Sequence, residues 1–460
     1  MSKSRKKRVN EFPTQFTVKN AVTKGDWATK LSMIILGFGN LVHKQFVKGF
    51  LFLLVEVCYI AYMAITGVAA IALLPSLGTL EQQEVWNEAK GVYEYVAGDN
   101  SLLILLFGIV AVLITFLFVL FWRGAVKSAY KAQWLKENGK HVNTFCDDVK
   151  MLFDKDLYKT MMFLPFTGIL IFSILPLLFM ICMAFTNYSK IGDHQMLFDW
   201  VGLENFKKVL SFGDSIGQTF WSVLGWTLIW AVFATFSNYI LGMLLAIIIN
   251  RKGTRLKKFW RFCFVLSIAV PQFVTLLTIR TMLQPDGAIN VLLRNWGLIA
   301  PGASLPFLTD AMWARVTVIV INLWVGMPFT MLQVTGILQN IPTELYEAAR
   351  VDGANAFVTF FKITLPYMLF VTAPYLITQF TGNINNFNVI YLLSGGAPVP
   401  VGSTAGKTDL LVTWLYKLTI DQQYYNLGAV IGILTFIVLS IVALVTYRNT
   451  GSYKDEEGFQ

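Results

Sequence analysis

The chain of 460 residues carries little charge. Only 14% of its residues are Asp, Glu, Lys or Arg, whereas soluble globular domains carry about 25%. It also has few of the residues that build metal and redox centres, with 3 histidines and 4 cysteines. No CxxC pair occurs, so the cysteines are expected to be small buried side chains without a metal or redox role. The shortage of charge excludes a string of soluble domains, because the polar surface that would cover them is missing.

Acidic residues are almost absent from the long apolar runs. Glu56 is the one carboxylate among them, and a position near the interface or a pairing role is favoured for it over ion coupling. Arg280 and Arg315 lie near run ends, where their side chains can reach the interface. No HExxH motif is present. These absences predict a chain that is not an enzyme, holds no metal and takes the energy for any uphill transport from elsewhere.

What the chain does contain is hydrophobic residues, which make up 55% of it and raise its mean hydropathy to +0.58. They gather in runs that are each long enough to cross a hydrocarbon core of about 30 Å. The sequence therefore predicts an all-α polytopic membrane protein with eight transmembrane helices. The predicted spans are residues 50–74, 101–122, 160–185, 219–249, 262–283, 313–335, 366–387 and 426–447.

Lys and Arg are distributed unevenly between the segments that join the spans. If the N-terminus is cytoplasmic, 28 of the 37 Lys and Arg residues lie in cytoplasmic segments and 7 in outer loops. Such segments are enriched in Lys and Arg when they face the cytoplasm, so both termini are predicted to be cytoplasmic. The cytoplasmic segments are then residues 1–49, 123–159, 250–261, 336–365 and 448–460.

The predicted organisation is an N-terminal transmembrane hairpin joined to a six-helix core. Within the cytoplasmic N-terminus, residues 27–48 are interrupted by Gly37 and Gly39 and are expected to form an amphipathic helix on the inner surface. An extension of the first span is the alternative. The domains are the N-terminus 1–49, the hairpin 50–122, a Lys-rich cytoplasmic linker 123–159, the core 160–447 and a cytoplasmic tail 448–460.

The predicted seventh span is unusually polar. Its amides Gln379, Asn383 and Asn386 are spaced four and three residues apart and therefore share one helix face. The sixth span adds the amide of Asn322 and the ring of Phe329. Amides that pair with vicinal hydroxyls, next to flat rings, suit an uncharged polyhydroxylated ligand. The alternative is that these amides hold neighbouring helices together.

A second informative segment, 342–366, lies on the predicted cytoplasmic side. Pro342 suits the first turn of a helix, and Gly353 permits a sharp reversal before a second amphipathic helix that would end with the segment. This pattern predicts a helix-turn-helix lying flat on the inner surface. Its small residues Ala348 and Ala349 would allow another protein to approach closely.

This segment carries a recognisable motif. The spacing Glu347-Ala348-Ala349, three residues, Gly353, nine residues, Ile363-x-Leu365-Pro366 resembles the full EAA motif of permease subunits of binding-protein-dependent ABC importers. Other runs look like the MalF-type sugar permeases, among them Ala269-Val270-Pro271, Gly326-Met327-Pro328-Phe329 and Asn385-Asn386-Phe387. The enterobacterial form has a large folded insert in its second outer loop, and the short segment 187–217 resembles the Gram-positive type instead.

The resemblance implies a non-catalytic subunit of an ABC importer in the bacterial plasma membrane. Such an importer moves an oligosaccharide into the cytoplasm, with maltose or maltodextrin as first choice and galacto- or multiple-sugar types as alternatives. The implied partners are a second homologous permease, two ATPase subunits that bind ATP and Mg, and an outer solute-binding lipoprotein, with no nucleic acid and no cofactor on this chain. A secondary transporter is the rival class, but it predicts carboxylates within the membrane.

The resemblance also implies two sets of functional residues, one that contacts the ATPase and one that contacts the sugar. In the sugar set, Gln379 departs from the smaller hydroxyl residue of the maltose type, which leaves the length or identity of the substrate open. The implied contacts to the ATPase are Glu347, Ala348, Ala349, Gly353, Leu365 and Pro366. The implied contacts to the sugar are Asn322, Gly326, Phe329, Gln379, Gly382, Asn383 and Asn386.

Overall fold

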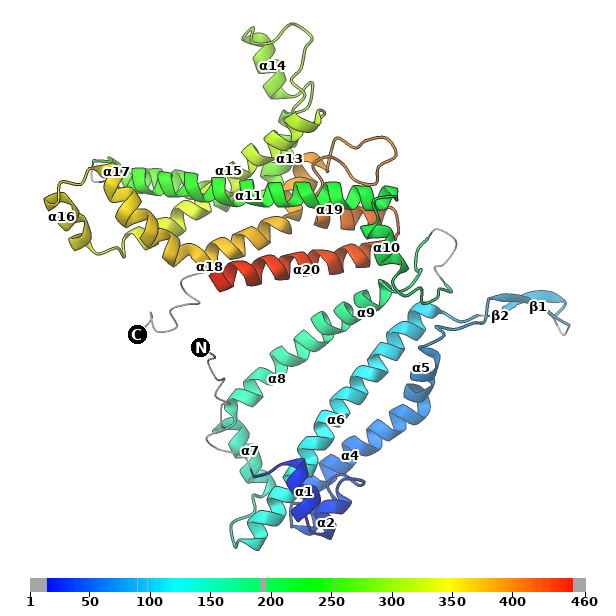
Figure 1. The fold of residues 1–460 in the computed structure, drawn as a ribbon. Coiled ribbons are helices and arrows are strands. Elements are labelled where there is room, and N and C mark those ends of the chain that lie inside the picture. The colour runs from blue at the N-terminus through cyan, green and yellow to red at the C-terminus, as the bar shows by residue number, and fades with distance from the viewer. Residues whose placement is uncertain (1–14, 89, 97, 191–195, 252, 450–460) are drawn as a thin grey trace, which may run out of the picture. The chain divides into compact units, whose positions relative to one another are not determined.

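The computed structural model describes all residues except 1–14, 89, 97, 191–195, 252 and 450–460. The start of the predicted N-terminal segment and most of the predicted tail therefore lie outside the described residues. The chain divides into two compact units (Figure 1). The first comprises Met1–Cys182 and Asp193–Trp200, and the second Met183–Gly192 and Val201–Gln460.

The predicted membrane-spanning architecture is confirmed. Among the described residues, seven helical segments are long and apolar enough to cross a membrane, and a bent pair of helices makes an eighth. The seven are Phe46–Leu73, Ser101–Glu137, Leu157–Met183, Ser215–Asn250, Ala311–Leu338, Ala356–Ser394 and Tyr425–Arg448.

Three spans and several short elements build the first unit. The connection between its first two spans forms an antiparallel hairpin, in which Gln83 lies opposite Val96; the sequence did not predict these strands. The elements are α1 (Val18–Lys24), α2 (Trp27–Leu31), α3 (Phe38–Val42), α4 (Phe46–Tyr62), the π-helical turn η1 (Met63–Gly67), α5 (Val68–Leu73), β1 (Gln83–Asn87), β2 (Val92–Val96), α6 (Ser101–Glu137), α7 (Phe145–Phe153), α8 (Leu157–Ile169), η2 (Leu170–Ile174) and α9 (Leu175–Met183).

The expectation of one amphipathic helix over residues 27–48 is wrong. The chain instead forms α2 and α3, which are separated by a turn that ends at Gly37. Gly37 has φ +82°, a conformation that glycine adopts at little cost, and a side chain there would overlap the backbone of Gly49. The short helices pack on the C-terminal half of α6, where Trp122 donates a hydrogen bond to the carbonyl of Met33 at 2.8 Å.

Glu56 has a structural partner in the same unit. Its carboxylate is buried, and Oε2 accepts a hydrogen bond from the backbone N–H of Leu36 at 2.7 Å. The turn between α2 and α3 is thereby tied to the first span. This contact supports the pairing interpretation of Glu56 over a role in ion coupling.

The second unit is organised around α11. This long helix packs against α15 and α18, while α20 packs against α18 and α10. The elements are α10 (Glu204–Leu210), α11 (Ser215–Asn250), α12 (Lys257–Ala269), α13 (Gln272–Met282), α14 (Ala288–Asn295), α15 (Ala311–Leu338), α16 (Thr343–Val351), α17 (Ala356–Thr359), η3 (Phe360–Thr364), α18 (Leu365–Ile384), η4 (Val389–Ser394), α19 (Leu411–Tyr416), η5 (Lys417–Asp421) and α20 (Tyr425–Asn449).

The predicted fifth span, 262–283, is not one straight helix. It is the bent pair α12 and α13, which meet at 88°. The break falls at Val270 and Pro271, both of which have extended backbone conformations. Proline lacks the N–H that a continuous helix would need and clashes with the preceding turn. Irregular backbone of this kind is tolerated at membrane depth where it lines a cavity.

The segment 342–366 also differs from its prediction. Its first helix, α16, is present, but the second helix does not end at Pro366. Residues 356–384 instead form a continuous helical segment, in which α17 and the π turn η3 lead directly into α18. Pro366 lies in the first turn of α18, directly after η3, where its missing N–H is compatible with the changed bonding of the π turn.

Candidate binding cavity and coupling segment

A cavity of about 350 Å³ lies in the second unit. Along α11 it is flanked by two hydrophobic clusters, one around Trp230 and Ala234 and the other around Tyr239 and Met243. Asn238 lies between the clusters and lines the cavity. The broken pair α12 and α13, together with α15 and α18, provides the other walls. The cavity thus interrupts an otherwise apolar core with a polar layer.

Two buried amide groups in this layer lack a hydrogen-bond partner among the described residues. The Nδ2 atom of Asn322 has none, and neither has the Oδ1 atom of Asn238. The other amide atom of Asn238, Nδ2, donates to the carbonyl of Ala234 at 2.8 Å. Buried polar groups are nearly always paired, because leaving one unpaired costs about 1 to 3 kcal/mol. One donor and one acceptor in the wall of this cavity are therefore unpaired among the described residues, and because both atoms are buried, a ligand reaches them only when the wall around them moves.

Gly326 makes this arrangement possible. It faces Asn238 across the contact between α11 and α15, and a Cβ atom at this position would overlap the Asn238 amide. Any larger residue would displace that amide. The helix contact and the shape of the cavity thus both depend on the absence of a side chain here.

The amides of the seventh span divide their bonds between neighbours and the cavity. Asn383 donates from Nδ2 to Thr235 at 2.9 Å and accepts from Asn386 at 3.4 Å. The side chain of Gln379 also lines the cavity, but no hydrogen bond joins it to another described residue. Asn383 therefore holds helices together as well as lining the cavity, so both interpretations of this polar face describe part of it.

Most of the predicted sugar contacts meet in this one cavity. Asn322, Gly326, Phe329, Gln379, Asn383 and Asn386 all line it. Gly382 does not; it is exposed, and no described atom lies within 4 Å of where its Cβ would be. Sequence reasoning missed Asn238 and Gln272. An amide in the middle of an apolar run was the signal that could have identified Asn238, as it identified Asn322.

The walls of the cavity are polar but uncharged. None of the described residues that line it is Asp, Glu, Lys or Arg. The rings of Trp324 and Phe329 are both largely exposed at its edge. Amide groups with aromatic faces can bind hydroxyl groups and the apolar face of a ring, and they offer nothing to neutralise an ionic ligand.

The helix α16 presents the other predicted set of residues. Glu347 and Ala348 are exposed, whereas Ala349 is buried against the chain itself. The hydroxyl groups of Tyr346 and Thr364 lie 3.1 Å apart and join α16 to η3. Ala348, and not the pair, is therefore available for a close contact with another protein.

Gly353 ends this helix as the sequence predicts. Its φ is +74°, and its N–H donates to the carbonyl of Arg350 at 3.1 Å. Gly353 and Pro366 are both exposed. Leu365 packs against the hydrophobic cluster around Tyr239 and Met243. The turn is thus fixed by local bonds and leaves the glycine on an open surface.

The chain contains one sequence pattern that is typical of a catalytic serine, but its surroundings are not those of a catalytic site. Residues 213–217 read Gly-x-Ser-x-Gly, the pattern of a hydrolase nucleophile elbow, which requires a strand before the serine. Here Ser215 is the first residue of α11, and α10 precedes it. The spacing therefore marks a helix start and not a nucleophile.

A polytopic helical chain with an uncharged cavity between two apolar clusters and an exposed surface helix has the features expected of a membrane transport subunit. The model of the family described as binding-protein-dependent transport system inner membrane component matches residues 238–450. The chain is 36% identical to the galactooligosaccharides transport system permease protein GanP of Bacillus subtilis, over 93% of this chain and 98% of that protein. It is 34% identical to the maltodextrin transport system permease protein MdxF of Bacillus subtilis, over 95% and 99%.

The chain therefore belongs to the permeases of binding-protein-dependent ABC importers, and it is a non-catalytic membrane subunit. The resemblance drawn from the EAA motif is confirmed. The maltose/maltodextrin permease MalF of Vibrio parahaemolyticus is 33% identical over 55% of this chain and 49% of that protein. The fold is similar to that of a bacterial alginate ABC transporter solved with a periplasmic protein bound to alginate pentasaccharide, with a TM-score of 0.55 and 22% identity over 66% of this chain and 98% of that one.

Proposed function

We propose that this permease carries an uncharged oligosaccharide, with maltodextrin as the first candidate, through the amide-lined cavity of its second unit. The unpartnered amide atoms of Asn322 and Asn238 carry the proposal, because they offer a donor and an acceptor in a cavity without charged walls. The names of GanP and MdxF support an oligosaccharide as cargo. Asn322, Gly326, Phe329, Gln379, Asn383 and Asn386 are the proposed contacts.

Galactooligosaccharide is the second candidate cargo. The identities to GanP and MdxF are similar, at 36% and 34%, so they do not separate the two sugars. Uptake of each labelled sugar into right-side-out vesicles that contain the assembled importer and internal ATP would separate them. Uptake that requires ATP and persists after a proton uncoupler supports the ABC mechanism. Uptake that the uncoupler abolishes would favour a secondary transporter.

The proposed orientation has both termini in the cytoplasm of a bacterium. It is supported by the excess of Lys and Arg in the segments on that side. In a cysteine-free background, Lys257→Cys should be shielded from an impermeant thiol reagent in intact cells, and Gly402→Cys should react. The opposite pattern would reverse the orientation and remove the cytoplasmic placement of α16.

The proposed partners are a second permease, two ATPase subunits that bind ATP and Mg, and an outer solute-binding lipoprotein. In this proposal the exposed face of α16, with Glu347, Ala348 and Gly353, docks on an ATPase subunit, and Ala349, Leu365 and Pro366 hold the helix in place. Gly353→Asp should leave the chain in the membrane but reduce co-purification of the ATPase and abolish uptake, because a side chain at φ +74° is strained and lies on the contact surface. Arg255→Gln, on a neighbouring cytoplasmic loop, is the control. A Gly353→Asp importer that retains both ATPase and uptake would contradict this docking site.

A further inference from the structure

A separate cavity of about 320 Å³ lies in the first unit. Its walls come from residues 44–48, where the first span begins, and from residues 143–148, where α7 begins. A small neighbouring cavity shares four of these residues and adds Lys131 of α6. The larger cavity is within the size range of small-ligand sites, about 300 to 1,000 Å³.

The walls of this pair of cavities carry excess positive charge. Lys48 and Asp148 form an ion pair, with Nζ and Oδ2 2.8 Å apart. Lys44 and Lys131 form no ion pair with any other described residue, and both are exposed. Two cationic groups therefore remain available to an anion, whereas the amide-lined cavity of the second unit has none.

Lys44 occupies a position that its conformation does not favour. It follows α3 with φ +67°, where glycine or asparagine is the usual residue. The backbone conformation therefore does not explain a lysine here. Its side chain lines the wall of the cavity, where the ammonium group can bind an anion.

Apolar side chains complete the cavity. Phe46, Val47 and Phe145 line it and are largely exposed. Phe46 is also the first residue of the membrane-spanning segment, so the cavity lies where that segment leaves the hydrocarbon. A soluble anion would gain nothing from these apolar walls, but a lipid has both a charged phosphate and acyl chains.

We infer that this pair of adjoining cavities binds the phosphate of an anionic phospholipid, with Lys44 of the larger cavity and Lys131 of the smaller one as its cationic contacts and the acyl chains along α4. Basic pockets beside transmembrane helices are a common setting for such headgroups. In the orientation proposed above, this lipid would lie in the cytoplasmic leaflet. The binding itself does not depend on that orientation or on the transported sugar.

Cys146 lines the cavity and is exposed, so the expectation that the cysteines are buried is wrong for this residue, and it provides a native probe. The full-length chain with Cys58→Ala, Cys182→Ala and Cys263→Ala keeps this one thiol, and its labelling rate can be measured in nanodiscs. Replacing phosphatidylcholine with phosphatidylglycerol should slow labelling at least threefold. The combined variant Lys44→Gln and Lys131→Gln should lose this protection, while Lys150→Gln, on α7 outside the cavity, should keep it. Equal melting temperatures establish that the variants are folded.

Soluble anions separate the two sources of phosphate. Inorganic phosphate or glycerol phosphate, added to phosphatidylcholine nanodiscs, should protect Cys146 little compared with phosphatidylglycerol. Equal protection by a soluble anion would overturn the lipid assignment. Protection by phosphatidylglycerol that persists in the double lysine variant, or no protection in the parent, would overturn the site. Because labelling requires no transport, these outcomes are independent of the sugar proposal.

Discussion

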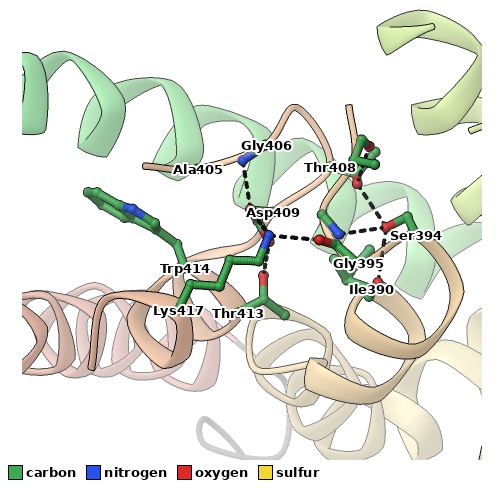
Figure 2. A network of polar contacts seen from close by, with 12 residues as sticks. Ile390, Ser394, Gly395, Ala405, Gly406, Thr408, Asp409, Thr413, Trp414 and Lys417 are labelled. Atoms are coloured by element: carbon green, nitrogen blue, oxygen red, sulfur yellow. Dashed lines mark hydrogen bonds and ion pairs between the residues drawn. The ribbon is translucent and has the colours of Figure 1, made fainter. Parts of the chain in front are cut away.

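Two polar groups of residues in the second unit differ in how completely their atoms are paired. In the first group, which we call the Asp409–Lys417 network, Lys417 lies 2.7 Å from Asp409 and donates to the carbonyl of Gly395 at the same distance (Figure 2). Asp409 is fully buried and also accepts hydrogen bonds from Gly406 and Thr413. In the amide-lined cavity, buried atoms of Asn238 and Asn322 have no partner among the described residues.

The difference separates a structural network from a candidate binding site. The Asp409–Lys417 network joins η4, the following loop, α19 and η5, and Figure 2 shows its members pointing toward one another. Its bonds are used within the chain. The cavity wall retains an unpaired donor and an unpaired acceptor among the described residues. Pairing, more than polarity, therefore indicates which group acts on a ligand.

The largest expected effect is a loss of stability when the Asp409–Lys417 network is broken. Asp409→Asn keeps the size of the side chain but leaves Lys417 without its carboxylate, and removing one partner of a buried ion pair costs about 3 to 5 kcal/mol. We expect a lower melting temperature in detergent and a smaller yield of folded chain. Asp421→Asn, at an exposed carboxylate on the end of η5, should change stability by less than about 0.5 kcal/mol. Equal melting temperatures for Asp409→Asn and the parent would show that this network does not stabilise the fold.

The next effect concerns the wall of the cavity. Gly326→Ala places a methyl group against the Asn238 amide, so uptake should fall more than tenfold, with a stability cost of about 1 to 3 kcal/mol from overpacking. Gly336→Ala, on the same helix, is the matched control because no described atom lies within 4 Å of its Cβ position. Normal uptake by Gly326→Ala would show that cargo does not use this cavity.

Much of the cavity could be predicted from residue spacing. The four- and three-residue intervals between Gln379, Asn383 and Asn386 place them on one face of a helix, and all three line the cavity. The sequence could not assign their bonds, because partners such as Thr235 lie 148 residues away along the chain. Gly382 was carried over from the motif alone, and its position on α18 takes it out of the cavity.

Spans were easier to predict than their interruptions. Hydrophobic runs identify membrane segments through composition alone, but they do not predict the 88° bend at Pro271, where α12 packs against α15 and α13 packs against η4. Pro328 lies inside α15 without such a break. Proline thus breaks one membrane segment and not the other, and the local sequence does not predict which one is broken. The turn at Gly37 similarly depends on the close approach of Gly49.

A smaller effect distinguishes the amides within the cavity. Asn322→Ala removes a donor with no partner in the described part of the chain, so sugar affinity should fall by about 1 to 3 kcal/mol while the melting temperature is unchanged. Asn383→Ala also removes the hydrogen bond to Thr235, so it should lower stability by about 0.5 to 1.5 kcal/mol in addition. Concentration-dependent uptake and thermal unfolding measure the two quantities. A stability loss for Asn322→Ala without an affinity change would make that amide structural.

The smallest effect is expected at Gly382. The motif assigns it to the sugar, but the structure leaves it exposed and outside the cavity. Gly382→Ala adds a methyl group that meets no described atom within 4 Å, and alanine in a helix is more favourable than glycine by up to about 1 kcal/mol. The apparent KM for sugar should therefore change by less than about twofold. If it rises as much as in Asn322→Ala, the cargo contacts α18 on a second face, and pairing within this one chain is not sufficient to delimit the binding site.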